Sequence, residues 1–137
     1  MEQRRNTFPK REHLCGHLLV DALYEKGDSF FVYPFRVVYD IVPLPENDDV
    51  AILCMVGVSK RKLKKAVHRN YVKRQTREAY RKNKHELWDF LEKSKKRLHL
   101  SLNYIGEKCE KSSVMERQTK KTLKKMLDII QSKSDVR

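Results

Sequence analysis

The stretch from Ser59 to Lys82 constrains this sequence most. It contains eleven lysines and arginines and a single acid, Glu78, so it carries a net charge of +10 out of the formal +13 of all 137 residues. From Ala66 onward it has no glycine or proline, and its pattern predicts a helix. A fold for this chain must therefore expose one strongly basic helix face while burying the other.

The spacing of the charges defines that face. Residues four apart lie on one side of a helix, so the four basic residues at this spacing form a single stripe, which Asn70 and Arg74 widen. Val72, Thr76 and Ala79 fall on the opposite side and are expected to pack against a core. The stripe consists of Arg69, Lys73, Arg77 and Arg81.

Phosphate is the expected ligand of this stripe. Like charges four residues apart cost an isolated helix a few tenths of a kcal/mol per pair, so stability alone does not favour the arrangement. The alternative is a solvated helix face, but such faces usually mix glutamate with lysine, and this stripe does not. Concentrated basic charge of this kind indicates nucleic-acid binding.

More basic residues precede the helix. The apolar run Val50 to Val58 predicts a strand, and the loop after it leads to the helix N-terminus, where backbone N–H groups favour anions. We expect the residues that bind nucleic acid to be those of this loop and of the helix: Lys60, Arg61, Lys64, Lys65, His68, Arg69, Asn70, Lys73, Arg74, Arg77 and Arg81.

The stretch VSKRKLKKAVHRNYVKRQTREAY resembles the signature of the bacterial ribonuclease P protein component. In that family a strand ending in Val-Ser-Lys-Lys leads to a helix carrying Arg-Asn-Arg-x-x-Lys-Arg-x-x-Arg-Glu. Two departures are visible: Tyr71 stands at the third position of the Arg-Asn-Arg triplet, and Lys64-Lys65 replaces a Gly-Asn pair in a loop that is one residue longer. The matching positions are Val58, Ser59, Lys60, Ala66, Val67, Arg69, Asn70, Lys73, Arg74, Arg77 and Glu78.

The resemblance implies a function and a second surface. It implies an RNA-binding subunit, without catalytic residues of its own, whose partner is a large catalytic RNA; that RNA carries out the Mg²⁺-assisted release of the 5′ leader from precursor tRNA. It also implies a cleft between the sheet and the first helix that holds the leader. Stacking on aromatic side chains tolerates any base, and each candidate could instead be a core residue. The candidates are Tyr24, Phe31, Tyr33, Phe35 and Tyr39.

The length and composition fit one RNA-binding domain over residues 1–137, with residues 1–8 and 132–137 expected to be flexible. Charged residues make up 36% of the chain, and the isoelectric point is about 9.8. The three cysteines are far apart and odd in number, which indicates neither a disulfide framework nor a zinc site. No apolar run is long enough to span a membrane. We expect a cytoplasmic protein that binds no cofactor itself and is monomeric without RNA.

The remaining segments predict the fold. A helix is expected from Lys10 to Lys26 and strand pieces from Phe30 to Val42, broken at Pro34. The run from Val50 to Val58 is expected in the middle of the sheet. After the basic helix come a second helical pattern over 85–96, an alternating strand over 97–105 and a closing helix from Met115.

This order, α-β-β-β-α-β-α, predicts an α+β fold: a two-layer sandwich with helices on a mainly antiparallel four-stranded sheet. The resemblance adds a left-handed strand–helix–strand crossover, against the usual preference.

Catalysis by the chain alone is not indicated. A metal-dependent nuclease needs clustered acids, and Glu46, Asp48 and Asp49 lie in a predicted turn. His13 and His17 have the spacing of helical metal ligands but no third ligand nearby, so surface positions are favoured. The other function considered is a ribosomal or ribosome-assembly protein of similar fold, which would not require this basic signature.

Overall fold

A four-stranded sheet forms the centre of the computed structural model, which describes residues 8–135. The strands are β1 (Asp28–Val32), β2 (Phe35–Pro43), β3 (Ile52–Val58) and β4 (Lys96–Tyr104), in the order β1-β2-β4-β3. The pairs β1–β2 and β2–β4 are antiparallel, and β3–β4 is parallel. The mainly antiparallel sheet predicted from the sequence is therefore confirmed.

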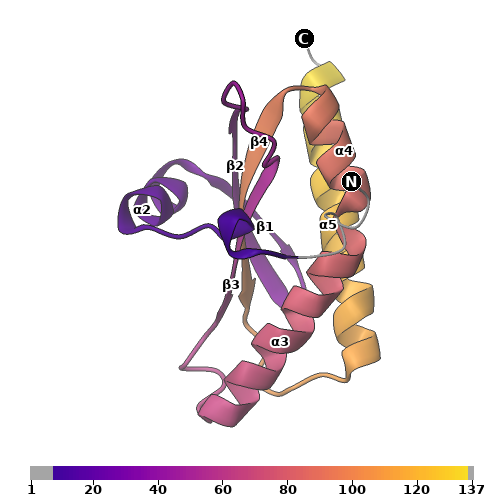
Figure 1. The fold of residues 1–137 in the computed structure, drawn as a ribbon. Coiled ribbons are helices and arrows are strands. Elements are labelled where there is room, and N and C mark those ends of the chain that lie inside the picture. Colours follow the sequence, from indigo (N-terminus) through magenta and orange to yellow (C-terminus); the bar gives the residue numbers. More distant parts are fainter. Residues whose placement is uncertain (1–7, 136–137) are drawn as a thin grey trace.

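Helices pack on both faces of this sheet. The helices α3 (Ala66–Asn83), α4 (His85–Lys93) and α5 (Ser112–Asp135) lie together on one side, while α2 (His17–Lys26) lies alone on the other (Figure 1). The mixed α+β class is confirmed, and α2 adds a short third layer to the expected sandwich.

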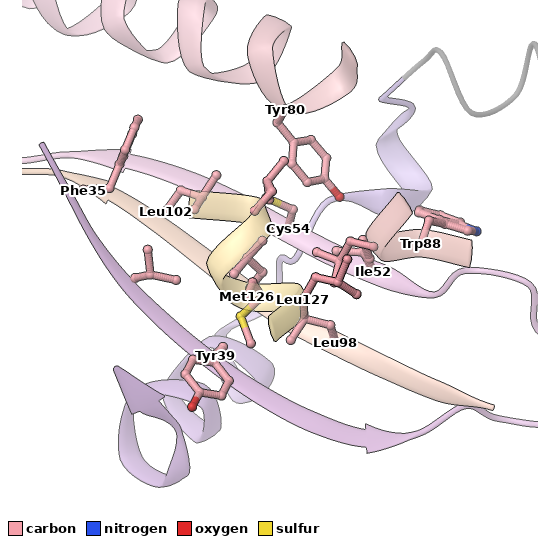
Figure 2. Close-up of a cluster of buried hydrophobic side chains, with 14 of the residues drawn as sticks. Phe35, Tyr39, Ile52, Cys54, Tyr80, Trp88, Leu98, Leu102, Met126 and Leu127 are labelled. Atoms are coloured by element: carbon pink, nitrogen blue, oxygen red, sulfur yellow. The ribbon is translucent and has the colours of Figure 1, made fainter. Parts of the chain in front are cut away.

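The main core lies between the sheet and the three-helix layer. In β4, the residues Leu98, Leu100, Leu102 and Tyr104 are all 0% exposed, which confirms the predicted alternation of that strand. Figure 2 shows the side chains of Leu98 and Ile52 meeting Met126 and Leu127 of α5. A smaller cluster on the α2 side joins Leu14, Leu23 and Val38. Each face of the sheet thus packs against helices through a separate hydrophobic cluster.

Two predictions about elements were wrong. The run 50–58 forms the edge strand β3 rather than a central strand. It is apolar because both of its faces are covered: α3 packs on one face, and on the other Leu53 and Met55 pack against the smaller cluster on the α2 side. The helix expected from Lys10 is broken into a 3-10 turn, η1 (Lys10–Glu12), and α2. Between them the Leu14 N–H donates to the Cys54 carbonyl at 2.8 Å, so this segment lies beside β3 instead of coiling.

The break also positions Glu12. Its Oε1 lies 2.5 Å from Nζ of Lys84, the residue between α3 and α4, and each side chain is 1% exposed. The rings of Phe8, Tyr80 and Trp88 surround the ammonium, with centroids 5.9, 5.7 and 5.0 Å from Nζ. This buried ion pair attaches the N-terminal segment to the helical layer.

The strand β3 connects to its parallel neighbour β4 through α3 and α4. The left-handed sense of this crossover stays a prediction.

The expected flexibility of 1–8 and 132–137 falls partly outside the described residues, while 132–135 continue α5. Of the described helices, none is both long and apolar enough to cross a bilayer.

Candidate nucleic-acid interface

The basic helix forms as α3, with the predicted division of its faces. Val72, Thr76 and Ala79 are buried at 0%, 0% and 3% exposure, because the sheet and α5 cover that side. Arg74 and Arg77 are exposed, and Lys73 is half-buried. The Arg74 guanidinium lies 5.8 Å from the ring centroid of Tyr71, so the residue that departs from the family signature contacts a basic neighbour.

One residue of the stripe also holds the loop that precedes the helix. Arg69 Nη1 donates to the carbonyls of Leu63 at 2.8 Å and Lys64 at 2.7 Å. Leu63 is 3% exposed and anchors the loop in the core, while the Ser59 hydroxyl accepts a hydrogen bond from the Lys62 N–H at 3.3 Å. The loop is therefore folded onto the helix.

The loop and the first turn of α3 present their cations to solvent. The exposed residues are Lys60, Arg61, Lys64, Lys65, His68 and Asn70. No side chain caps the helix N-terminus at Lys65, so its first N–H groups are not covered by a cap. Basic side chains and helix N–H groups thus occur together at one end of the stripe.

The single acid of α3 is paired within the helix. Glu78 accepts two hydrogen bonds from Arg81, at 3.0 and 2.7 Å. The hydrogen bonds to Arg81 hold the pKa of Glu78 below its usual value. Arg81 is therefore partly neutralised, and the charge on the stripe is centred on Lys73, Arg74 and Arg77.

Two residues missed by the sequence reasoning adjoin the stripe. Phe8 and His13 line a hollow of about 440 Å³ together with Arg74, Arg77 and Arg81. The break between η1 and α2 brings them there, and the helical spacing of Lys10–Lys26 gave no signal of it. His13 is thus not a helical partner of His17.

The opposite face of the sheet holds some of the leader-cleft candidates. Tyr24 is 43% exposed, and its hydroxyl lies 2.6 Å from Ser101 Oγ and donates to Asn103 Oδ1 at 3.1 Å. Phe31, 60% exposed, pairs with Arg36, and Arg36 pairs with Asn103, so these three share the face that α2 partly covers. Arg36 and Asn103 could have been found from the alternation of their strands.

Three other aromatic candidates lie elsewhere. Phe35 and Tyr39 are 0% and 6% exposed and belong to the main core, because they alternate with Arg36 and Val38 on the helix-covered face. For these two candidates the alternative that the sequence left open, a core position, is the one found. Tyr33 is 61% exposed but lies in the turn between β1 and β2, where its carbonyl accepts a hydrogen bond from Gln118 of α5.

Among the described residues no group of three or more histidine, cysteine or acidic side chains could hold a metal ion. Cys54 is fully buried, and desolvation raises the pKa of its thiol.

The fold and this surface define a class: an α+β protein with one exposed, strongly basic helix and a basic loop before it. The sequence model of a family described as Ribonuclease P matches residues 8–127. The chain belongs to the ribonuclease P protein family.

Proteins of similar sequence or structure support this family assignment. A ribonuclease P protein component of Porphyromonas gingivalis W83 is 36% identical over 115 residues, covering 83% of this chain and 82% of the relative. One from Chlorobium phaeobacteroides is 28% identical over 108 residues, covering 75% and 71%. The structure of Staphylococcus aureus RNase P protein has a TM-score of 0.56 at 21% identity, covering 82% of this chain and 93% of that one, which supports the fold.

Membership in this family makes the chain an RNA-binding subunit of a tRNA-processing ribonucleoprotein endoribonuclease, with ribonuclease P RNA as its partner. A ribosomal role is not favoured.

Proposed function

We propose that α3 and the loop before it dock phosphates of the ribonuclease P RNA, and that the α2 side of the sheet holds the 5′ leader of precursor tRNA. The RNA performs the Mg²⁺-assisted hydrolysis, and the protein positions the substrate. Because tRNA precursors are made in the cytoplasm, we place the activity there. The observation that carries the proposal is the basic cluster of exposed Arg74 and Arg77 with half-buried Lys73, beside a loop folded by Arg69.

The docking proposal is tested by the salt dependence of binding. Each phosphate contact contributes about 0.7 to 0.9 to the slope of log affinity against log salt. The double variant Lys73→Ala/Arg77→Ala should therefore bind the RNA subunit more weakly and flatten the slope by about 1.4 to 1.8 units. Lys26→Ala/Lys93→Ala is the matched control, since both lysines are exposed on other helices. Equal slopes for the two double variants would refute the docking surface.

The leader proposal rests on Tyr24. Its hydroxyl is held by Ser101 and Asn103, which fixes the ring above the sheet at 43% exposure. Removing a stacked ring costs about 1–3 kcal/mol per contacted base. Tyr24→Leu should therefore weaken binding of the assembled particle to precursor tRNA by about 5- to 150-fold and leave mature tRNA, which lacks a leader, unaffected.

Tyr39→Leu is the control for this test. Because Tyr39 lies in the core, its replacement should lower the melting temperature without discriminating between the two RNAs. A Tyr24→Leu variant whose affinity falls equally for precursor and mature tRNA, or falls for neither, would contradict a leader cleft on this face.

A further inference from the structure

A second basic surface lies on α5, away from the α3 stripe. The helix buries Met115, Leu123, Met126 and Ile130 against the core. Its exposed side carries two rows of lysines at four-residue spacing, together with Arg117. The rows are Lys120 with Lys124 and Lys121 with Lys125.

These cations are poorly balanced by acids. Among the side chains described, those of residues 8–133, no carboxylate forms an ion pair with these five basic groups. Glu116, on the same side, pairs with Lys82 of α3 at 3.7 Å. Like charges four residues apart destabilise a helix slightly, so the two rows are not explained by helix stability.

Three of these lysines border a hollow with an exposed aromatic ring. A hollow of about 520 Å³ separates the β1–β2 turn from α5; Tyr33 and Val32 line it on one side, and Lys121, Lys124 and Lys125 on the other. Tyr33 is 61% exposed. The volume is in the range of small-molecule sites, so a nucleobase fits.

The walls of the hollow are held in place. Gln118 Nε2 donates to the Tyr33 carbonyl at 2.5 Å, which ties the turn to α5. Lys125 Nζ lies 5.1 Å from the ring centroid of Phe30, so this cation rests on the strand beside the hollow. A ligand would therefore meet a formed site rather than loose side chains.

We infer that this hollow binds single-stranded RNA, with the three lysines contacting phosphates and Tyr33 stacking on a base. Stacking needs an unpaired base, which excludes the interior of a duplex. Asp128 also lines the hollow and repels phosphate, so the backbone should lie nearer Lys121. The hollow shares no residue with the α3 stripe or with Tyr24, although Phe31, a leader-cleft candidate, also lines it.

The test is an NMR titration of the full ¹⁵N-labelled chain with a decauridylate and with a duplex of the same length. The decauridylate should shift the amide signals of Lys121–Lys125 and of Tyr33, and the duplex should not shift that of Tyr33. Lys121→Ala/Lys125→Ala should abolish these shifts, whereas the charge-matched Lys26→Ala/Lys93→Ala should retain them. Tyr33→Leu should weaken the affinity read from the α5 signals by about 5- to 150-fold.

Three results would overturn the inference: no shifts on α5, equal binding of the duplex at Tyr33, or a Tyr33→Leu variant of unchanged affinity. The Lys73→Ala/Arg77→Ala variant separates this site from the docking proposal. In this variant the RNA-induced shifts on α3 should disappear and those on α5 should remain. The proposal for the α3 stripe and the inference for the α5 hollow can therefore be refuted separately.

Discussion

Replacing Glu12 by glutamine should destabilise the protein by about 3–5 kcal/mol, because it removes the carboxylate that pairs with the buried Lys84 ammonium. Both side chains are 1% exposed, so water cannot replace the lost carboxylate. The three aromatic rings around Lys84 lie 5.0 to 5.9 Å away and compensate only partly. Glutamine keeps the size of the side chain, so the change removes charge rather than volume.

The expected change in melting temperature follows from the length of the chain. An unfolding entropy of about 2.1 cal/mol/K per residue gives roughly 0.29 kcal/mol/K for 137 residues. A loss of 3–5 kcal/mol therefore lowers the melting temperature by about 10–17 °C. Circular dichroism during heating measures it.

Arg11→Gln is the matched control for Glu12→Gln. Arg11 adjoins Glu12 in η1 and pairs with Asp49 at 3.0 Å, but these side chains are 47% and 45% exposed. An exposed pair contributes about 0–1 kcal/mol, so this control should melt within a few degrees of the wild type. The double variant Glu12→Leu/Lys84→Met removes both charges and should recover most of the stability. Equal melting temperatures for Glu12→Gln and Arg11→Gln would refute the reasoning.

Three further predictions concern single residues. Arg69→Lys cannot keep both hydrogen bonds to the loop carbonyls, so we expect altered loop amide signals and weaker RNA binding; unchanged signals would contradict this. Hydrogen bonds from the Val50 N–H and, second, from the Arg97 side chain hold the pKa of Asp48 below its usual 3.8. The ionised Asp48 carboxylate therefore stabilises the fold above pH 3.8, and this stabilisation is lost as the pH falls through the lower folded-state pKa. Asp48→Asn should flatten this acid dependence of the melting temperature, and an unaltered profile would argue against the pair. Buried Cys54 should react with a thiol reagent only after unfolding, unlike exposed Cys15, as labelling followed by mass spectrometry would show.

The sequence predicted the features that depend on local periodicity. The alternation of Leu98, Leu100 and Leu102 placed one face of β4 in the core, and the four-residue spacing of α3 separated its buried and basic faces. These predictions hold because the periodicity within a single helix or strand indicates which of its faces is exposed to water.

Features that depend on contacts distant in sequence were not predictable in this way. An apolar run indicates burial on both faces, but it does not distinguish a central strand from an edge strand covered by helices, as β3 is. The aromatic residues of 30–42 suit both cleft and core, and the pairing with β4 decided that Tyr39 lies inside while Arg36 lies outside. The Glu12–Lys84 pair joins residues 72 positions apart, and nothing local indicates it.

The most direct test of the account is cleavage of precursor tRNA by the protein, by the ribonuclease P RNA of the same organism, and by both together at one Mg²⁺ concentration. We predict no leader release by the protein alone and faster release by the mixture than by the RNA alone, with the Lys73→Ala/Arg77→Ala variant requiring more protein for the same rate. Leader release by repurified, RNA-free protein, or a variant as effective as the wild type at limiting protein, would contradict a subunit that acts by docking RNA on α3.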